Sequence, residues 1–401
     1  MTNKEFLFIF DAALSNPNGD PDTENKPRMD RATKTNLVSD TRLKRTIRDY
    51  LIAKFDADTT TQNDVFVRMM GEQKVSVEKR LMGVVTRYLQ DKAKLEELKE
   101  KHQDLKIAFE RLRAIKDKDS GSTDEEGAPK SKKKTEPFKG DDFELYHSFI
   151  KKDQDLATGI SKTKELGEVN NELLTAIIKE TMIDSRFFGG AFAVGGFSKT
   201  VTGSIQVNTG YSLHPVELNP SNSIVTIMGD KEGQSGIGKK ETLFYSLISH
   251  TGTINAKRGA IVNLSEDDLR HFREAIILSI LDWRSDSKKN QYPRLYLEID
   301  YKENEIYGRL GDLRNLISVT SNVDTDFSKV RSIKDVSIDF SMLVTGLEKI
   351  KSKIQKIRIW TSLDGACESL AVSLKEKFPE QEITKEDGSK ENVEVIEILN
   401  I

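Results

Sequence analysis

Residues 5–11 read EFLFIFD, and residues 16–27, shortly after them, read NPNGDPDTENKP. The first stretch is apolar enough to predict a strand buried in a sheet. The second contains three prolines and a glycine, and it predicts a long polar loop because regular elements tolerate these residues poorly. The start of the chain is therefore expected to form a buried strand followed by a long polar loop.

A basic helix is predicted after this loop. Apolar side chains between residues 43 and 51 recur at the spacing of one face of an α-helix. Arg42, Arg45 and Arg48 fall on the other side of that helix. Residues 26–48 contain eight basic and two acidic side chains, so their net charge of +6 is the sharpest local excess in the chain.

The charge of this helix has two interpretations. Helices often carry a solvated charged face, and composition alone supports that interpretation equally well. Between Asp40 and Asp49, however, the sequence holds four cations and no acid, so we expect these cations to lack the i,i+4 partners of a purely solvating face. Clustered arginines facing a polyanion would release counterions and bind it in a salt-sensitive, sequence-independent way.

Composition limits the class of protein. The 401 residues include 62 Lys and Arg against 65 Asp and Glu, a formal net charge of −3, which argues against a wholly basic nucleic-acid binder. Cys367 is the single cysteine, which excludes an intrachain disulfide and a multi-cysteine metal site and favours the cytoplasm. The sequence shows no membrane or export signal and no cofactor motif.

The rest of the chain mixes helices and strands. Residues 84–118 carry a narrow apolar stripe that predicts a helical hairpin or a helix packed against a partner, and residues 116–140 predict a disordered loop. Glycine-rich residues 187–210 predict short strands. Ser265 and Asp268 predict the capped start of a helix, and alternation over residues 295–301 predicts a half-buried strand. Without a regular βαβ period, the fold class is α+β.

Several catalytic patterns are incomplete. Residues 233–239 (GQSGIGK) match most of a phosphate-binding P-loop, but Lys240 stands where the magnesium-binding hydroxyl is needed. This stretch is better interpreted as a glycine–lysine loop that touches phosphates, or as a plain solvated loop. Asp20, Asp22 and Asp30 could hold one magnesium ion for phosphodiester cleavage, although acids in such loops are more often turn formers.

Aromatic residues and histidines add no catalytic set. Phe187 and Phe188, beside Arg186, could stack nucleobases, but core packing explains them equally well. The five histidines lie far apart, and the sequence contains no GxSxG elbow or HExxH pair. Cys367 lies in a helical pattern and is expected to be packed rather than nucleophilic.

Three blocks of sequence carry a family resemblance. The first consists of NPNGDPD at 16–22, NKPRMD at 25–30 and NLVSDTRLKRTIRDY at 36–50. The second consists of DSRFFG at 184–189, TGSIQ at 202–206 and YSLHP at 211–215, and the third of GKK at 238–240 with LFY at 243–245. Together they resemble the repeated backbone subunit of type I CRISPR surveillance complexes (Cascade), most closely its subtype I-B branch.

The resemblance implies a modified RRM-like (ferredoxin-like) core with a helical finger insertion and a β-hairpin thumb. Residues 1–85 would form the N-terminal part of the palm, and residues 86–145 the helical insertion with its Lys/Glu-rich loop. Residues 146–401 would supply the remainder of the palm, the thumb near residues 225–250 and the C-terminal strands.

The resemblance also implies a non-catalytic scaffold that polymerises along CRISPR guide RNA and presents it for pairing with target DNA in antiviral defence. The implied partners are the guide RNA, the target strand through the guide, further copies of the chain, other Cascade subunits and a recruited helicase-nuclease. By position in or beside the matched blocks, RNA binding is carried onto twelve residues: Asn16, Asn18, Arg28, Arg42, Lys44, Arg45, Arg48, Arg186, Ser198, Lys199, Lys239 and Lys240.

Two other classes compete with the scaffold. The type III relatives of this subunit use a loop aspartate to cut target RNA, so Asp20, Asp22 or Asp30 would be the candidate in a metal-dependent RNA-cleaving subunit. A protein-interaction module without nucleic acid is the third class, and it predicts no excess absorbance at 260 nm in the purified protein.

Overall fold

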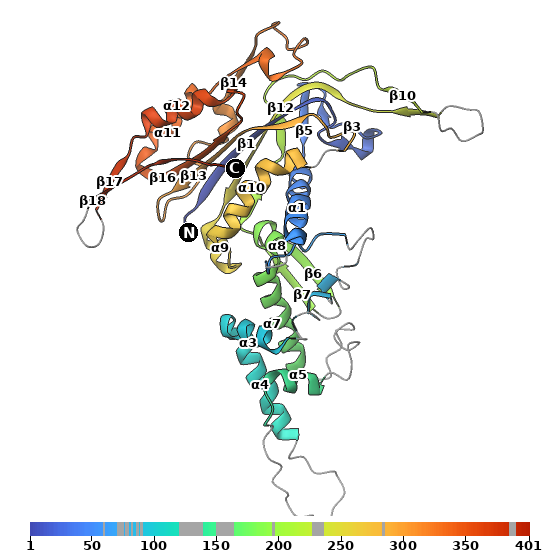
Figure 1. Cartoon of the computed structure of the whole chain (residues 1–401), viewed down its shortest axis with the longest axis vertical. Helices are drawn as coiled ribbons and strands as arrows, with labels where there is room; N and C mark the ends of the chain where they lie inside the picture. The colour runs from blue at the N-terminus through green and yellow to red at the C-terminus, as the bar shows by residue number, and fades with distance from the viewer. Residues whose placement is uncertain are drawn as a thin grey trace, which may run out of the picture. The chain divides into compact units, whose positions relative to one another are not determined.

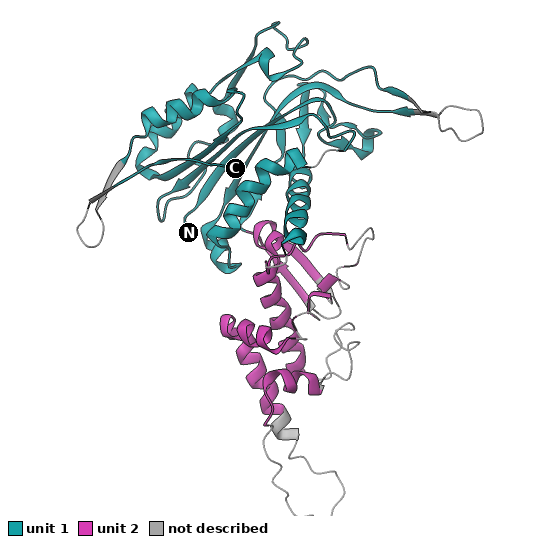
Figure 2. Cartoon of the chain, in the orientation of Figure 1, with its two compact units in different colours: residues 1–59, 204–401 teal, residues 60–203 magenta. Residues whose placement is uncertain are grey.

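The computed structural model of the chain consists of two compact units, Met1–Thr59 with Ser204–Ile401 (unit 1) and Thr60–Gly203 (unit 2) (Figure 2). The helical insertion expected at residues 86–145 therefore covers only part of unit 2. The structure describes residues 1–58, 61–69, 76, 80, 81, 83–85, 88, 91–119, 139–149, 164–194, 197–226, 236–282, 285–384 and 390–401.

Unit 1 is built on one large sheet (Figure 1). Its strands, in spatial order, are β19 (Ile396–Ile398), β16 (Ile354–Thr361), β13 (Gln291–Tyr301), β1 (Lys4–Ser15), β12 (Leu243–Ile254), β9 (Gly210–Ser212), β5 (Thr35–Val38) and β4 (Met29–Asp30), with β8 (Ile205–Val207) beside β12. The predicted N-terminal strand is confirmed as β1, which is antiparallel to both β12 and β13. Its apolar sequence suits this central place, because both of its edges are paired.

Helices cover both faces of this sheet. On one face, Phe6 of β1 meets Phe272 of α10 (Glu266–Asp282), with ring centroids 5.5 Å apart. Leu7 points to the opposite face, where it joins a core with Leu343 of α11 (Ser341–Lys349) and Leu370 of α12 (Glu368–Lys377). Helix α1 (Asp40–Ala57) packs against α10. Interleaved helices and strands make this an α+β fold, as predicted.

The capping signal predicted for α10 is confirmed. The backbone N–H of Asp268 donates to Ser265 Oγ at 3.0 Å, and the Ser265 N–H donates to Asp268 Oδ2 at 3.0 Å. These reciprocal bonds satisfy donors that the first turn of a helix leaves free. Helix α1 starts in a similar way, because Ser39 Oγ accepts from the N–H of Arg42.

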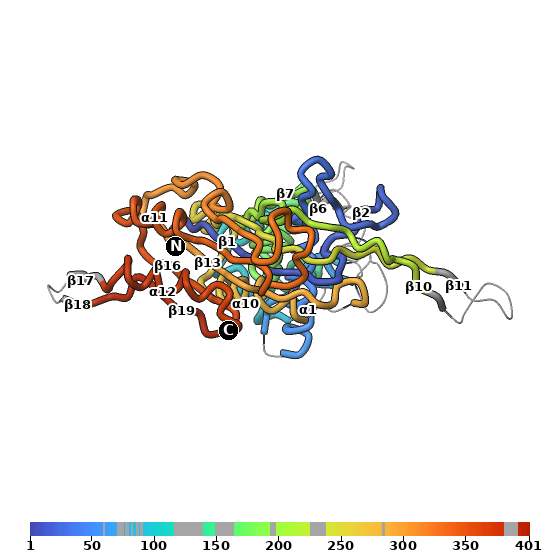
Figure 3. The backbone as a smooth tube through the Cα atoms, turned by 90° about the horizontal axis from the view of Figure 1, so that it is seen from above, coloured from blue at the N-terminus to red at the C-terminus, as the bar shows by residue number. Residues whose placement is uncertain are grey.

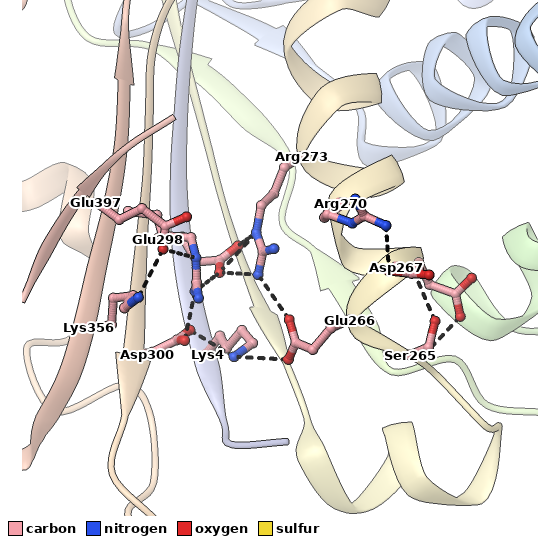
Figure 4. Close-up of polar contacts among 12 residues, drawn as sticks. Lys4, Ser265, Glu266, Asp267, Arg270, Arg273, Glu298, Asp300, Lys356 and Glu397 are labelled. Atoms are coloured by element: carbon pink, nitrogen blue, oxygen red, sulfur yellow. Dashed lines mark hydrogen bonds and ion pairs between the residues drawn. The ribbon is translucent and has the colours of Figure 1, made fainter. Parts of the chain in front are cut away.

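Strand β13 is buried on both faces, so the prediction of a half-buried strand is wrong. The polar residues between its apolar positions lie under α10 in a network of ion pairs (Figure 4). Glu298 is fully buried, and its Oε1 lies 2.8 Å from Arg273 Nη2 of α10 and 2.9 Å from Arg358 Nη1 of β16. Asp300 pairs with Lys4 of β1 at 2.9 Å. Alternation of apolar and polar residues does not show whether the polar face of a strand meets solvent or a buried layer of charges.

Unit 2 is mainly helical. It contains α3 (Lys92–Lys101), α4 (Gln103–Asp119), α5 (Asp142–Phe149), α7 (Lys164–Thr181), α8 (Ile183–Phe188) and the hairpin of β6 (Gly190–Val194) and β7 (Phe197–Val201). Leu95, Phe109 and Leu173 are fully buried in one core. The apolar stripe predicted in this region therefore packs within the unit itself. The loop predicted to be disordered lies outside the described residues over 120–138.

Unit 1 also carries smaller elements. These are α9 (Ala256–Ile261), the pair β14 (Ser318–Ser321) and β15 (Val336–Asp339), the pair β17 (Gln381–Thr384) and β18 (Lys390–Val393), and the hairpin of β10 (Ser223–Thr226) and β11 (Gly236–Lys239). Figures 1 and 3 show β10 and β11 extending away from the sheet on the side of the N-terminal loop. The hairpin leads directly into β12, in the region where the resemblance implies a thumb.

Removing the buried carboxylate should destabilise unit 1. In Glu298→Ala, the guanidiniums of Arg273 and Arg358 would stay buried without their shared partner, and we expect a loss of about 3–5 kcal/mol in the free energy of unfolding, measured by urea titration. The exposed Glu303→Ala is the control and should change it by less than about 0.5 kcal/mol. Equal losses in both variants would contradict this role.

The same carboxylate predicts a pH dependence. Burial pushes the pKa of Glu298 up, but the guanidiniums of Arg273 and Arg358 outweigh burial and hold the pKa below its ordinary value of 4.5. Its contribution to stability is therefore full above pH 4.5 and lost as the pH falls through the lower pKa of the folded state.

Candidate nucleic-acid interface

The polar segment after β1 is an ordered set of short elements rather than an irregular loop. It contains β2 (Gly19–Asp20), a 3-10 turn (Pro21–Thr23), β3 (Lys26–Pro27), β4 and β5. Glu24 and Asn25 have φ angles of 55° and 60°, the left-handed conformation that a tight turn between β2 and β3 requires and that asparagine adopts more readily than most residues.

Asn16 and Asn18 hold this segment in place. Asn18 Oδ1 accepts from the backbone N–H of Ser39 at 2.8 Å and from its hydroxyl at 2.9 Å, which ties the segment to the start of α1. Asn16 donates its side-chain N–H to the carbonyl of Asn25 at 2.7 Å. Both asparagines are buried, at 1 % and 8 % exposure. Their hydrogen bonds shape the loop and tie it to the start of α1.

The cations of α1 do have partners along the helix. Lys44 Nζ lies 2.9 Å from Asp40 Oδ2, and Arg45 Nε lies 2.8 Å from Asp49 Oδ2. The expectation that these cations lack i,i+4 partners is wrong for Lys44 and Arg45, because Asp40 and Asp49 each lie four residues away from one of them. Arg45 nevertheless keeps 43 % of its side chain exposed, so a competing anion can reach it.

Lys288 is a cation that the sequence analysis did not select. It lies in the turn after α10 and donates from Nζ to the carbonyl of Asn16. Burial and the nearby charge of Arg42 lower the pKa of Lys288 to about 8. Arg42 itself donates to the carbonyl of Pro17 at 3.4 Å and to the Thr46 hydroxyl at 2.7 Å. Two like charges thus lie close together beneath the loop, an arrangement that favours a nearby anion.

The base of the β10–β11 hairpin meets the loop at a cavity. The cavity has a volume of about 360 Å³. Its lining brings together the predicted residues Asn16, Lys239 and Lys240 with residues from the turn after α10. Residues 227–235, which include the start of the P-loop-like stretch, lie outside the described part of the chain. Lys239 and Lys240 therefore belong to the same surface as the N-terminal block, although more than 200 residues separate them.

A second cavity lies on the loop itself, with a volume of about 260 Å³. Lys26, Arg31 and Lys34 contribute to its lining. Arg28 lies in the same loop, where its Nη2 is 3.3 Å from Asp20 Oδ1 and its side chain is 38 % exposed. Four of the eight basic residues at 26–48 therefore lie on this loop.

Three other predicted residues belong to unit 2. Arg186 is buried, and its guanidinium donates to the carbonyls of Lys179 and Glu180 and to Asn63 Oδ1. Its donors serve the interior of the unit, and Phe187 is fully buried as well, which favours core packing over base stacking. Ser198 and Lys199 are exposed on β7.

The loop aspartates have local roles. Asp20 faces Arg28, and Asp30 accepts from the Thr33 hydroxyl at 2.8 Å and from the Ala32 N–H at 3.0 Å. These bonds lower the pKa of Asp30. Across the described residues, no group of three or more His, Cys, Asp and Glu side chains is placed to hold a metal ion.

Cys367 is buried at the start of α12. Burial raises the pKa of its thiol to about 12, which keeps it protonated and unreactive at neutral pH. In the part of the chain that the structure describes, no helix is long and apolar enough to cross a membrane.

The fold and its basic edge define an α+β protein whose cations gather around the loop that follows the first strand. Residues 2–341 match the family described as CRISPR-associated protein Cas7. The chain belongs to this family, which bears out the resemblance seen in the sequence.

Similar proteins include a CRISPR-associated protein Cas7 from Haloferax volcanii, which is 25 % identical over 386 residues, 90 % of this chain and 86 % of that protein. A solved chain described as "CRISPR RNA-guided surveillance complex, pre-nicking" has a TM-score of 0.46 and 13 % identity, covering 93 % of this chain and 100 % of the other. A second, described as "CRISPR RNA-guided surveillance complex", has a TM-score of 0.40 and 14 % identity, covering 90 % and 92 %.

The lowered pKa of Lys288 predicts a pH-dependent stability. Between pH 8 and the ordinary lysine pKa of 10.5, the unfolded chain keeps a proton that the folded chain has lost, so this residue makes the free energy of unfolding rise with pH. From pH 7.5 to 9, the wild type should gain about 1 kcal/mol relative to Lys288→Met, measured by urea unfolding. Parallel pH profiles for the two proteins would contradict the lowered pKa.

Proposed function

We propose that this chain is an RNA-binding backbone subunit of a type I CRISPR surveillance complex, in which several copies assemble along one guide RNA. Membership of the Cas7 family supports this role. The observation that carries it is the gathering of cations at one edge of unit 1, where the loop, the base of the hairpin and the turn after α10 converge. Contacts to phosphates position the RNA, while sequence is read by pairing between guide and target.

A modified RRM-like core fits this proposal. The four central strands lie in the order β13–β1–β12–β9, and neighbouring strands are antiparallel. In sequence, α1 comes between β1 and β9, and α10 comes between β12 and β13. Both helices pack on the face of Phe10, which lies near Leu43 of α1 and Ile280 of α10. This order of strands and helices supports a βαββαβ arrangement like that of ferredoxin-like folds.

The opposite face of the sheet is covered, which favours RNA binding at the edge of the sheet. In an ordinary RRM this face is open, and its aromatic side chains stack on bases. Here Leu7, Ile9 and Leu247 occupy that face and are buried in the core that includes α11 and α12. Because the sheet offers no open stacking platform at these positions, RNA contacts fall to the loops and to the hairpin base.

The hairpin of β10 and β11 is proposed as the thumb that reaches over the neighbouring copy. In this arrangement the thumb displaces one base at regular intervals, so that the target DNA strand pairs with the guide in short segments. Other Cascade subunits would complete the complex, which would recruit a helicase-nuclease to degrade the target. We assign the chain to the subtype I-B branch on the motifs of its first block.

A scaffold without catalytic activity agrees best with the loop acids. Asp20 and Asp30 are engaged in hydrogen bonds that shape the loop. Asp22 is exposed in a 3-10 turn. Nothing in this arrangement favours the metal-dependent cleavage used by type III relatives, and degradation is assigned to the recruited nuclease.

Co-expression with a guide-RNA array and its processing nuclease tests the assembly. We expect a large multimer whose RNA, after limited ribonuclease treatment, remains as fragments of regularly spaced length, because each copy covers one segment. A nucleic-acid-free protein that stays monomeric when the other subunits are added would overturn the proposal. Magnesium-dependent cleavage of guide-complementary RNA that is lost in Asp20→Ala, Asp22→Ala or Asp30→Ala would replace the scaffold by the cleaving subunit.

Neutralising the exposed side of α1 should weaken RNA binding. In Arg45→Gln with Arg48→Gln, we expect lower affinity for single-stranded RNA and a salt slope of log K against log[salt] that is smaller by about 1.4, because two phosphate contacts are removed. Lys375→Gln with Lys377→Gln on α12 is the matched control and should leave the slope unchanged. Thermal melting of each variant verifies folding, and an unchanged slope in the α1 variant would place the site elsewhere.

A further inference from the structure

The turn after α10 contributes an unexpected group to the cavity at the hairpin base. Ser285, Asp286 and Ser287 line this cavity together with Lys239 and Lys240. The turn is tied to the loop, because the Asn16 N–H donates to the carbonyl of Ser287 at 2.8 Å. The lining of the cavity therefore combines residues of the loop after β1, of the hairpin base and of the turn after α10.

A single carboxylate bridges two lysines at this place. Asp286 Oδ2 lies 2.7 Å from Lys240 Nζ, and Asp286 Oδ1 lies 2.9 Å from Lys289 Nζ. The two ammonium groups lower the pKa of Asp286 to about 2, so the carboxylate is ionised at every physiological pH. A looser pair joins Lys239 Nζ to Glu24 Oε2 at 3.8 Å. The cations of the cavity thus already have anionic partners in the chain without RNA.

These pairs contribute little to stability. The Asp286 side chain is 70 % exposed, and those of Lys239 and Glu24 are 63 % and 72 % exposed. Exposed pairs of this kind gain little Coulomb energy in water and lose side-chain entropy. The carboxylate of such a pair is therefore easily displaced by another anion of suitable geometry.

The surroundings of Asp286 suit a phosphodiester. Two ammonium groups supply charge, and the flanking Ser285 and Ser287 supply hydroxyl donors on the same lining. No hydrogen bond of either hydroxyl is found within the described residues. A phosphate carries the same single charge as the carboxylate and more acceptor oxygens, so it can use donors that Asp286 does not.

We propose that this cavity is a single-phosphate subsite of the RNA interface, and that the carboxylate of Asp286 occupies it until an RNA phosphate displaces it. The proposal rests on the RNA-binding role proposed above. Asp286 then acts as an internal competitor that lowers the affinity of an isolated chain for RNA. In an assembled complex, the further contacts along a continuous guide RNA would offset this lower affinity.

A double-mutant cycle on the full chain tests the exchange. With Asp286→Asn, the affinity for a single-stranded RNA oligonucleotide, measured by fluorescence anisotropy, should increase about threefold to tenfold, because the lysines no longer have a competing partner. Lys240→Gln should weaken binding. In the double variant, the gain from Asp286→Asn should be clearly smaller than in the wild-type background, because only Lys289 then remains as a cation that the carboxylate occupies.

The matched control is Asp267→Asn on α10. Asp267 also pairs with a cation three residues later, Arg270, and its side chain is 75 % exposed, but it lies outside the cavity lining. Its substitution makes the same change in net charge, and RNA affinity should stay within about twofold of the wild type.

Three outcomes would overturn the subsite. They are an equal gain from Asp267→Asn, a full gain from Asp286→Asn in the Lys240→Gln background, and no gain from Asp286→Asn in a protein that binds RNA. The first would attribute the effect to net charge, and the second would show that Lys240 has no part in it. A wild-type chain that binds no RNA, alone or in the complex, would remove the proposed function and the subsite together.

Discussion

The buried pairing of Glu298 with Arg273 and Arg358 is the constraint on which the organisation of unit 1 depends. It joins α10 to β13 and β16 at a place where Glu298 is fully buried and the side chains of Arg273 and Arg358 are 6 % and 13 % exposed. A position of α10 that separated them would leave a buried charge without its partner, which is costly. The network therefore fixes where α10 lies on the sheet, and with it the place where the turn at residues 285–289 meets the loop after β1.

The covered sheet determines where cations can stay exposed in unit 1. With α10 on one face and α11 and α12 on the other, the strands offer no open surface at their centre. Cations instead collect where chain segments leave the sheet, around the loop that Asn18 ties to the start of α1. Ionic groups at such an edge stay hydrated, so a polyanion can exchange with the ion pairs already there.

Much of the framework was predictable because its signals are local. The apolar run of β1, the stripe of α1 and the Ser265–Asp268 cap are short-range patterns, and the structure contains all three elements. Other predictions failed where a partner lies far along the chain or in another layer. The charged positions of β13 look solvent-facing until α10 covers them.

The sequence by itself determined the family, the α+β class and the basic N-terminal segment, because motifs, periodicity and local charge depend only on residues close together in the sequence. Only the tertiary structure decided that Lys240 meets Asp286, and that Lys288 lies beneath the loop beside Arg42. These contacts join segments more than 40 residues apart, so they follow from strand order and helix packing rather than from any local pattern. An ion pair across such a separation exists only once the sheet has brought its two segments together.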